Sequence, residues 1–448
     1  MLYAKLCSHE LNLHVSCYFE ATPSNLGLEM GSSLTKSMSA ERAEKTTASD
    51  HQTSNRVPGI DVLRGLCIIA VVLHHINLRI HFRDSSFGHW IGPAANRALF
   101  WSGYYGVRVF FVISGFLITT WSLKRWGNLA QLNRRQFYVM RFARIVPCLV
   151  GLLLVLSILD RAGIPQFTVN TQHTSLWRAL LAALTFHVNW LEARTGYLPA
   201  NWDVLWSLSV EEVFYIFFPL LCTLVRKQAL LVALLCCLIV IGPYARIHTQ
   251  NELWSDYGYL SCMDGIAFGC LAAMLAATVK FSGRANIAWG SIGAMLCIFI
   301  DILRGPASRL GLYKMGLDVT TLEIGTALLL IALQQNFEKC SLGAAASLSN
   351  PGASTKLASI SRALWNSMAF LRWYGRNSYE VYLTHMLVVW PAVILFFHFH
   401  QSINTAPLWF LATTAFSGLM GYVVARFYSE PLNRGLRTKM VANATAIH

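Results

Sequence analysis

Long apolar stretches follow one another along the chain from about residue 62 to near its C-terminal end. Polar and basic residues separate them, and most are long enough to cross, or nearly cross, the roughly 30 Å hydrocarbon core of a membrane as a helix. Alternation with the period of a strand is not sustained anywhere. The pattern therefore predicts an all-α integral membrane bundle. The apolar segments are residues 62–82, 103–123, 144–160, 176–190, 205–225, 228–245, 257–278, 286–303, 318–336, 378–399 and 407–425.

The short segment 176–190 decides the predicted topology. The loop 124–144 is strongly basic and has no acidic residue, which places it and the N-terminus in the cytoplasm. If segment 176–190 crossed the membrane, the later basic loops would all face outside, against the charge rule. It is also short and contains Arg178 and His187. We therefore expect ten transmembrane helices, one short re-entrant or interfacial helix, and both termini in the cytoplasm.

Three further parts of the chain differ from the membrane segments in composition. Residues 1–56 are polar and rich in Ser, Thr and Glu, and we expect a disordered cytoplasmic tail. The membrane domain then covers residues 57–437. Inside it, residues 337–377 form a Ser- and Ala-rich cytoplasmic linker loop that ends in an amphipathic stretch on the membrane surface. Residues 438–448 are a C-terminal tail.

Composition supports the membrane class and removes others. Hydrophobic residues make up 55% of the 448 residues and charged residues only 13%, about half the charged share of a soluble domain. The net charge of +14 is typical of basic cytoplasmic loops, so we expect membrane lipid and no nucleic acid as a partner. The 11 cysteines are scattered without metal-type spacing, and we expect no metal site and no disulfide framework.

Charged residues inside apolar segments are costly unless they pair or line a cavity, so each is a candidate for function. Arg64 and His75 are eleven residues apart in the first segment. Eleven helical steps of 100° return to within about 20° of the start, so the two share a face and lie about 16 Å apart along the axis. The alternative is that Arg64 reaches the headgroups and His75 is a structural histidine. His74 is about 80° away and is the less favoured partner of Arg64.

Five other ionisable residues in apolar segments are candidates for function. Glu211 and Glu212 are adjacent, so they point about 100° apart and only one can face the centre of the bundle. For each residue, a functional and a structural interpretation both stay open, and a histidine inside a bundle is more often structural. The five are Arg108, Glu211, Glu212, Asp264 and His385.

At this point the sequence resembles the acyltransferase-3 family over nearly all of residues 58–437. The Arg-x10-His pattern of Arg64 and His75, within IDVLRG, is similar to the family signature. GVRVFFVISGFLIT, FYVMRFARIVP, LWSLSVEEVFY, MDGIAFG, YGRNSYEVYLTH and SEPLNR resemble its later blocks, in the same order. Two departures, Val213 where Gln is common and Thr384 where an aromatic residue is frequent, bear mainly on substrate preference.

The resemblance implies transfer of an acyl group, usually acetyl from cytosolic acetyl-CoA, to a hydroxyl group outside the cytoplasm. Acceptors in the family include lipopolysaccharide, exopolysaccharide, peptidoglycan and lipid-linked sugars. We therefore expect an O-acetyltransferase of a bacterial inner membrane, with acyl-CoA as the donor substrate, a glycan or glycolipid as acceptor and no permanently bound cofactor. The chain shows no hydrolase-like domain of the kind fused to some members, so we expect the membrane domain to act alone.

These residues allow a mechanism as a hypothesis. Arg64 would hold the phosphates of coenzyme A, because guanidinium matches phosphate oxygens. His75 would be the general base for the acceptor hydroxyl or carry the acyl group. Glu211 or Glu212 would orient that imidazole or bind the sugar, and Arg108 would stabilise the carbonyl oxygen. The candidates are thus His75, Arg64, Glu211 and Glu212 for catalysis, and Arg108, Asp264, His385, Arg141 and Arg144 for substrate or donor binding.

A multi-pass transporter for a small polar solute or glycoside is the main alternative function. Intramembrane Arg, His, Asp and Glu also mark transport pathways. The sequence shows no internal repeat and no matching pair of segments broken by Gly or Pro, which disfavours a transporter. An inactive relative that acts only as a scaffold is a third interpretation, and the retained ionisable positions argue against it.

Overall fold

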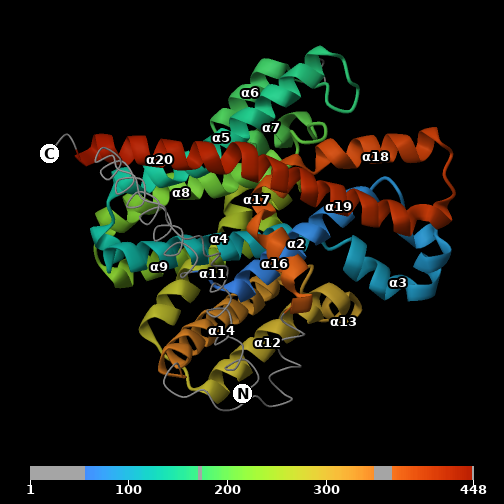
Figure 1. Ribbon diagram of the computed structural model, residues 1–448. Helices are drawn as coiled ribbons and strands as arrows, with labels where there is room; N and C mark the ends of the chain where they lie inside the picture. Colours follow the sequence, from blue (N-terminus) through green and yellow to red (C-terminus); the bar gives the residue numbers. More distant parts are fainter. Residues whose placement is uncertain (1–55, 170–173, 348–365, 446–448) are drawn as a thin grey trace, which may run out of the picture. The chain divides into compact units, whose positions relative to one another are not determined.

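The computed structural model describes residues 56–169, 174–347 and 366–445 (Figure 1). In these ranges the regular structure is entirely helical, which confirms the predicted helical class. The expected disordered tail lies outside the described residues except for Arg56, as does the middle of the expected linker loop, residues 348–365.

Nine helices or helix pairs in the described ranges are long and apolar enough to cross a membrane, or ten if one bent pair counts as a span. That pair is α17 (Ser378–Thr384) and α18 (Met386–His398), bent by 48° at His385. The other long helices are α2 (Pro58–Asn77), α4 (Gly103–Trp126), α5 (Arg134–Arg161), α8 (Leu205–Val225), α9 (Gln228–His248), α11 (Tyr259–Thr278), α12 (Gly283–Ile302), α14 (Leu317–Ser347) and α19 (Ala406–Val424).

Short helices connect the long ones. The predicted segment 176–190 forms two of them, α6 (Leu176–Leu184) and α7 (Val188–Thr195). With 9 residues, α6 is only about 14 Å long, too short to cross a membrane. The others are α3 (Ser86–Phe100), α10 (Glu252–Tyr257), α13 (Arg304–Arg309), α16 (Ala369–Arg376) and α20 (Glu430–Thr445).

One predicted boundary is wrong. The sequence placed the start of a linker loop at residue 337, whereas α14 continues without a break to Ser347. The stretch Asn336–Ser347 contains Glu, Lys, Leu and Ala and no proline, and such residues extend a helix readily. The amphipathic stretch that follows is helical only as α16 within the described residues.

Helix ends follow local sequence signals. Asn133 caps the start of α5 by accepting a hydrogen bond from the Gln136 amide, and Ser175 does the same for α6 with the Arg178 amide. Gly127 ends α4 with a φ of 72°, a conformation that glycine adopts without strain. The basic loop between α4 and α5 therefore begins and ends at defined residues.

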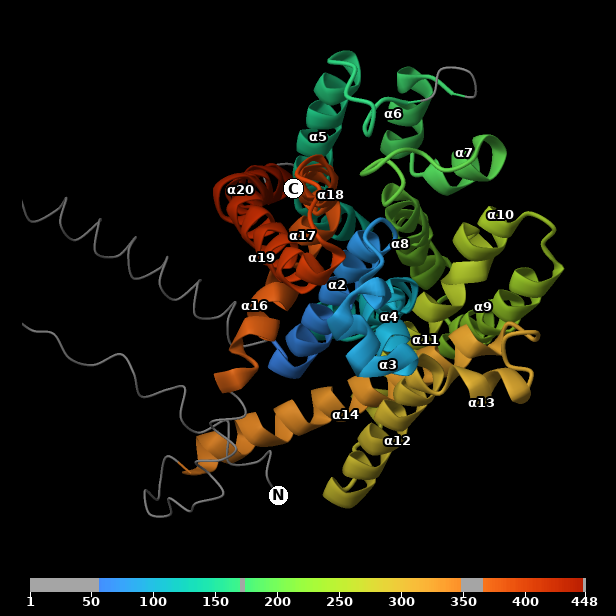
Figure 2. The ribbon, with the colours of Figure 1, turned by 90° about the vertical axis from the view of Figure 1, so that its right-hand side faces the viewer.

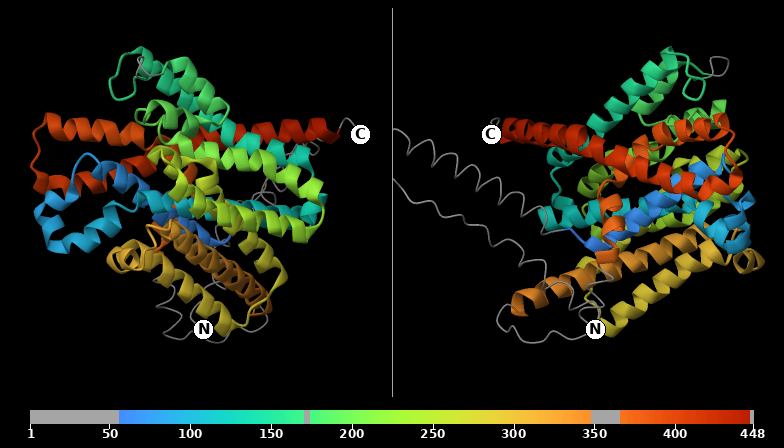
Figure 3. Two further views of the ribbon diagram at one scale, coloured as in Figure 1. Left: turned by 180° about the vertical axis from the view of Figure 1, so that it is seen from behind. Right: turned by 45° about the vertical axis from the view of Figure 1, so that its right-hand side comes forward.

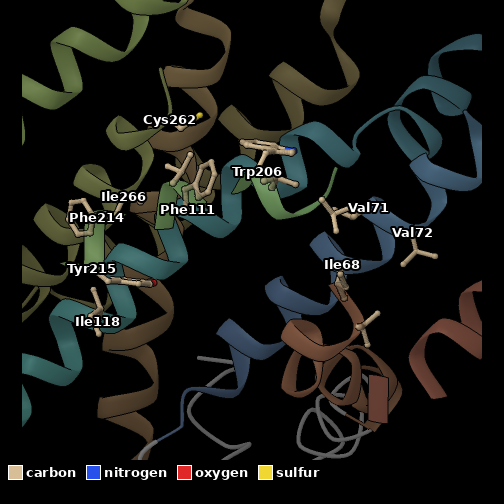
Figure 4. Packing of buried hydrophobic residues seen from close by; sticks show 14 of the residues in the cluster. Ile68, Val71, Val72, Phe111, Ile118, Trp206, Phe214, Tyr215, Cys262 and Ile266 are labelled. Carbon is tan, nitrogen blue, oxygen red and sulfur yellow. The ribbon is translucent and has the colours of Figure 1, made fainter. Parts of the chain in front are cut away.

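The centre of the bundle is formed by α2, α4, α8 and α11. Figure 2 looks along the helices and shows α2 and α4 in the middle, with α17 and α19 to one side and α8 and α11 to the other. Gly115 of α4 and Gly269 of α11 let these two helices touch, because a Cβ at either position would collide with a backbone carbonyl of the other helix. Figure 4 shows buried residues from these four helices, among them Ile68, Val71, Phe111, Ile118, Trp206, Phe214, Tyr215 and Ile266.

The C-terminal helix α20 continues the direction of α19 beyond a short π-helical turn, Ala425–Ser429 (Figures 1 and 3). It packs along α5. This packing brings Arg437 of α20 near Arg141 and Arg144 of α5.

Candidate functional site

Two histidines from distant parts of the chain meet inside the bundle. His75 lies near the end of α2, and His385 lies at the bend between α17 and α18. Nε2 of His385 is 3.4 Å from Nδ1 of His75, and the ring centroids are 4.9 Å apart. His385 is fully buried and His75 is half-buried. The pair is a candidate centre for proton transfer.

Backbone carbonyls define the tautomers of this histidine pair. Nδ1 of His75 lies 2.8 Å from the carbonyl oxygen of Val71, and Nδ1 of His385 lies 2.7 Å from that of Tyr382. A carbonyl oxygen only accepts hydrogen bonds, so each Nδ1 carries the hydrogen. Each Nε2 therefore holds a lone pair. The lone pair of His385 faces the Nδ1–H of His75, and Nε2 of His75 is left as a base.

Arg64 lies on the same side of α2 as His75. Its Nη2 donates a hydrogen bond of 2.8 Å to Ser378 Oγ, at the start of α17. His75 contacts His385 at the far end of the same helix. Since both residues contact one neighbouring element, they share a face of α2, as their spacing predicts.

Glu211 and Glu212 lie beside Arg141. The Arg141 guanidinium stacks on the Tyr215 ring at 3.6 Å and interacts electrostatically with both carboxyl groups. The Tyr215 hydroxyl contacts Ser114 Oγ and donates a 3.5 Å hydrogen bond to Glu211. Glu212 is 7% exposed, so it is the more buried of the two. A basic residue from the start of α5 thus reaches two acids in α8.

Neither glutamate orients the imidazole of His75. Within the described residues, no hydrogen bond joins Glu211 or Glu212 to His75 or His385, and the neighbour of His75 is His385 instead. The predicted orienting role of the glutamates therefore has no supporting hydrogen bond in the described residues. Both glutamates lie near Arg141 of α5, and electrostatic interactions also link Glu212 to Tyr379 and Glu211 to Tyr382 on α17.

Arg144 extends the basic region to the start of α17. Its guanidinium lies 5.7 Å from the centroid of the Tyr379 ring, and Tyr379 follows Ser378, the partner of Arg64. Arg141 also interacts electrostatically with Tyr379. Arg64, Arg141 and Arg144 thus all lie near the start of α17, whereas Arg108, the other arginine among the candidates, lies elsewhere.

Arg108 and Asp264 are engaged in structural contacts elsewhere. Arg108 is fully buried and donates to the carbonyl oxygens of Ser261 and Asp256, at 2.8 and 2.9 Å, and to the Tyr104 hydroxyl. Asp256 lies in the last turn of α10, where carbonyl oxygens lack helical partners, and Arg108 donates a hydrogen bond to one of them. Asp264 forms an ion pair of 2.8 Å with Arg246. In the described ranges neither residue bonds to His75 or His385.

Two residues of this network, Arg246 and Glu323, were not among the candidates from the sequence. Glu323 is fully buried, and electrostatic interactions link it to Asp264, Arg246 and Arg108. Glu323 lies inside the apolar sequence TTLEIGTALLL, and a charged residue in such a position is itself an indication of a buried polar site. Arg246 directly follows the apolar segment 228–245, so it was counted as part of a loop.

Three more residues missed by the sequence lie just beyond His75. Arg79 donates to the His75 carbonyl oxygen at 3.3 Å and stacks on Trp390 at 4.5 Å. Burial raises the pKa of Asp203 to about 7, although a hydrogen bond with Glu192 and the charge of Arg79 oppose the rise. Burial and the charge of Asp203 also raise the pKa of Glu192 well above its usual value. Both carboxyl groups therefore keep their protons to higher pH than exposed carboxyl groups do.

The structure thus places a pair of histidines and several arginines inside a helical bundle with long apolar helices. The family model of an acyltransferase domain, Acyl_transf_3, matches residues 57–426. The chain therefore belongs to the acyltransferase-3 family.

Curated proteins that are similar to this chain are named as O-acetyltransferases. The peptidoglycan O-acetyltransferase OatA of Listeria monocytogenes is 31% identical over 170 residues, which are 36% of this chain and 24% of that protein. The O-acetyltransferase OatA of Staphylococcus aureus NCTC 8325 is 24% identical over 237 residues, 49% of this chain and 34% of that protein. A putative O-acetyltransferase of Staphylococcus aureus COL is 27% identical over 173 residues, 37% and 24% of the two chains. The chain thus spans about a quarter to a third of the length of these relatives. No solved structure matches it.

Proposed function

We propose that this protein transfers an acetyl group from acetyl-CoA on the cytoplasmic side of a bacterial inner membrane to a hydroxyl group of a carbohydrate on the outer side. The observation that carries the proposal is the His75–His385 pair, with Arg64 on the same face of α2 toward the other end of the helix. The acceptor is a polysaccharide or glycolipid. The names of the relatives support O-acetylation, and that of the Listeria protein supports a glycan acceptor.

The topology belongs to the same proposal. Counting α17 and α18 as one broken span gives ten crossings, and an even number places both termini on one side. The basic loop between α4 and α5 favours the cytoplasm for that side. The short helices α6 and α7 then stay on the outer side as the re-entrant or interfacial element. Arg64 and the start of α5 lie at the cytoplasmic end of the bundle.

His75 acts as general base in this mechanism. Its Nε2 takes the proton of the acceptor hydroxyl as the oxygen attacks the thioester carbonyl carbon. The carbon–sulfur bond breaks, and the thiolate of coenzyme A leaves and takes the proton from the imidazolium. The lone pair of His385 stabilises the imidazolium through its Nδ1–H. In the alternative route, Nε2 attacks the thioester carbonyl carbon and coenzyme A leaves as thiolate, which puts the acetyl group on His75. The acceptor hydroxyl then attacks that acetyl group, the bond from the acetyl carbon to Nε2 breaks, and the hydroxyl proton passes to the thiolate.

Arg64, Arg141 and Arg144 bind the donor. Arg64 lies about 16 Å from His75 along α2, a separation comparable to the reach of the pantetheine arm. A phosphate held at the arginines therefore allows the thioester to reach the histidines. Arg guanidinium groups suit phosphate because they donate two parallel hydrogen bonds.

Glu212 and Glu211 hold Arg141 in place in this proposal, next to Tyr215. They act on the reaction through donor binding, not through the imidazole. Arg108 and Asp264 are not assigned to substrate, because Arg108 donates to backbone carbonyl oxygens and Asp264 pairs with Arg246.

The test is the ester-linked acetate on cell-surface and secreted glycans. We would compare a deletion strain complemented with the wild type, His75→Ala or His398→Ala at equal membrane levels. His398 is an exposed histidine at the end of α18 and serves as the matched control. Acetate should return with the wild type and His398→Ala and stay absent with His75→Ala. Full acetylation by His75→Ala would contradict the proposed mechanism.

A transporter is the second candidate, and the buried network of Arg108, Arg246, Asp264 and Glu323 favours it, since charged groups inside a membrane also form ion pathways. The two functions differ in a proteoliposome assay. An acyltransferase releases free coenzyme A from acetyl-CoA when acceptor is present. A transporter accumulates labelled glycoside without acetyl-CoA.

A further inference from the structure

Arg437 lies on the C-terminal helix α20, which packs along α5. It is half-buried, and its Nε is shielded from solvent without a hydrogen-bond partner. Its charge interacts with those of Arg144 and Arg141 on α5. Three guanidinium groups from two helices that are far apart in the sequence thus gather at one place.

These three positive charges are not neutralised by ion pairs. In the part of the chain that the structure describes, neither Arg141, Arg144 nor Arg437 forms a salt bridge with a carboxylate. Arg141 interacts with Glu211 and Glu212 only at longer range, and Arg437 and Arg144 repel each other. The Nε of Arg141 is also shielded and without a partner. Half-buried like charges without a carboxylate at ion-pair distance are costly unless an anion binds near them.

Arg434 shows what an ordinary arginine does on the same helix. It is exposed and pairs with Glu430 one turn earlier, at 3.1 Å. Arg437 is three residues further on, is more buried and lacks such a partner. The different burial and pairing of these two arginines therefore come from their positions on α20, because both are the same residue type.

We propose that Arg437 joins Arg141 and Arg144 in binding a phosphate group of the coenzyme A donor, so that the C-terminal helix α20 forms part of the donor site. This proposal rests on the proposed function. Arg141 and Arg144 were candidates from the sequence, and Arg437 was not. Arginine suits this role because its planar fork binds two phosphate oxygens at once.

A lipid headgroup offers the same phosphate chemistry, but the position of the cluster favours the donor. Arg144 lies over Tyr379, whose neighbour Ser378 binds Arg64. From Arg64, the face of α2 leads to His75 and His385. A phosphate held by Arg437 is therefore continuous with the path that the thioester must take.

The test measures binding of free coenzyme A to the full-length protein in nanodiscs of neutral phosphatidylcholine, by calorimetry. Arg437→Gln should raise the Kd about tenfold or more, as expected for the loss of a charge-assisted contact to phosphate. Arg434→Gln should change the Kd less than about twofold. Arg437→Lys keeps the charge but not the fork, and its Kd should lie between those of the wild type and Arg437→Gln.

Each result bears on the proposal. If the wild type binds coenzyme A and Arg437→Gln binds it equally well, the role of Arg437 is overturned while the proposed function stands. If gel filtration shows that Arg437→Gln does not fold, the Kd of Arg437→Lys for coenzyme A is the test. A Kd equal to that of the wild type overturns the role of Arg437. If the wild type does not bind coenzyme A, the donor in the proposed function fails as well. The last measurement uses nanodiscs that contain phosphatidylglycerol. If this lipid stabilises the wild type against heat but not Arg437→Gln, and the Kd for coenzyme A is unchanged in the variant, the cluster binds lipid. That result overturns the proposal.

Discussion

Replacing His385 by leucine removes the nitrogen that faces Nδ1 of His75 and leaves the general base itself in place. The Nδ1–H of His75 keeps its main acceptor, the Val71 carbonyl at 2.8 Å. What is lost is a second acceptor at 3.4 Å, which matters most when His75 becomes positively charged. A hydrogen bond to a charged group is worth about 1.5–3 kcal/mol. Because 3.4 Å is long for such a bond, we expect the lower end of this range.

At about 1.4 kcal/mol per tenfold change in rate, His385→Leu should lower kcat about tenfold and leave the KM for acetyl-CoA unchanged. The assay is release of free thiol from acetyl-CoA by the purified protein in the presence of acceptor. His75→Ala should lose at least about a hundredfold, since it removes the base. His385→Gln offers an amide oxygen near the lost nitrogen and should recover most of kcat.

Two results would refute this reasoning. An unchanged kcat in His385→Leu would show that the second histidine does not act on the first. A loss as large as that of His75→Ala, not recovered by His385→Gln, would show instead that His385 is needed for folding or is itself the base. His398→Ala controls for the loss of a histidine on the same helix.

Three further predictions concern other parts of the bundle. Arg64→Ala should raise the KM for acetyl-CoA at least about tenfold with a smaller change in kcat, and saturating acetyl-CoA should restore the rate. Asp203 holds its proton to about pH 7 in the folded protein but only to about pH 4 when unfolded, so stability falls as pH rises through this window. The thermal midpoint of Asp203→Asn should accordingly depend less on pH between 5 and 8 than that of the wild type. Arg246→Ala leaves Asp264 buried without its partner and should destabilise the protein by roughly 3–5 kcal/mol, measured by unfolding in detergent; Arg246→Ala combined with Asp264→Ala should recover part of the loss.

The sequence was most informative where function depends on one helix. The Arg64–His75 face follows from 100° per residue, and both residues do contact the same neighbouring helix. The long apolar segments likewise correspond to helices, because length and hydropathy alone determine whether a helix can span a membrane. The short segment 176–190 was recognised for the same reason.

Contacts between helices were much harder to predict. His385 is 310 residues from His75, and no local pattern specifies which two faces meet. Glu380, although only five residues before His385, does not bond to it and accepts a hydrogen bond from Ser429. Arg108 stood out as a charge inside an apolar segment, but its partners are backbone carbonyls of α10 and α11. These helices follow about 150 residues later in the chain, so the sequence identified the charge but not its partners.

The spacing of the site residues on α2 and α17 also explains why position 64, at the cytoplasmic end of the proposed site, needs an arginine. Arg64 and His75 are eleven residues apart, about 16 Å along α2, whereas their partners Ser378 and His385 are seven residues apart, about 10 Å along α17. The roughly 6 Å difference is about the reach of an extended arginine side chain, and Arg64 does reach Ser378 at 2.8 Å. Lysine would reach a similar distance but donate from a single nitrogen, so it could not hold Ser378 and a phosphate in a fixed fork. Arg64→Lys should therefore bind acetyl-CoA more weakly than the wild type even though the charge is kept, and equal binding would contradict this use of the guanidinium.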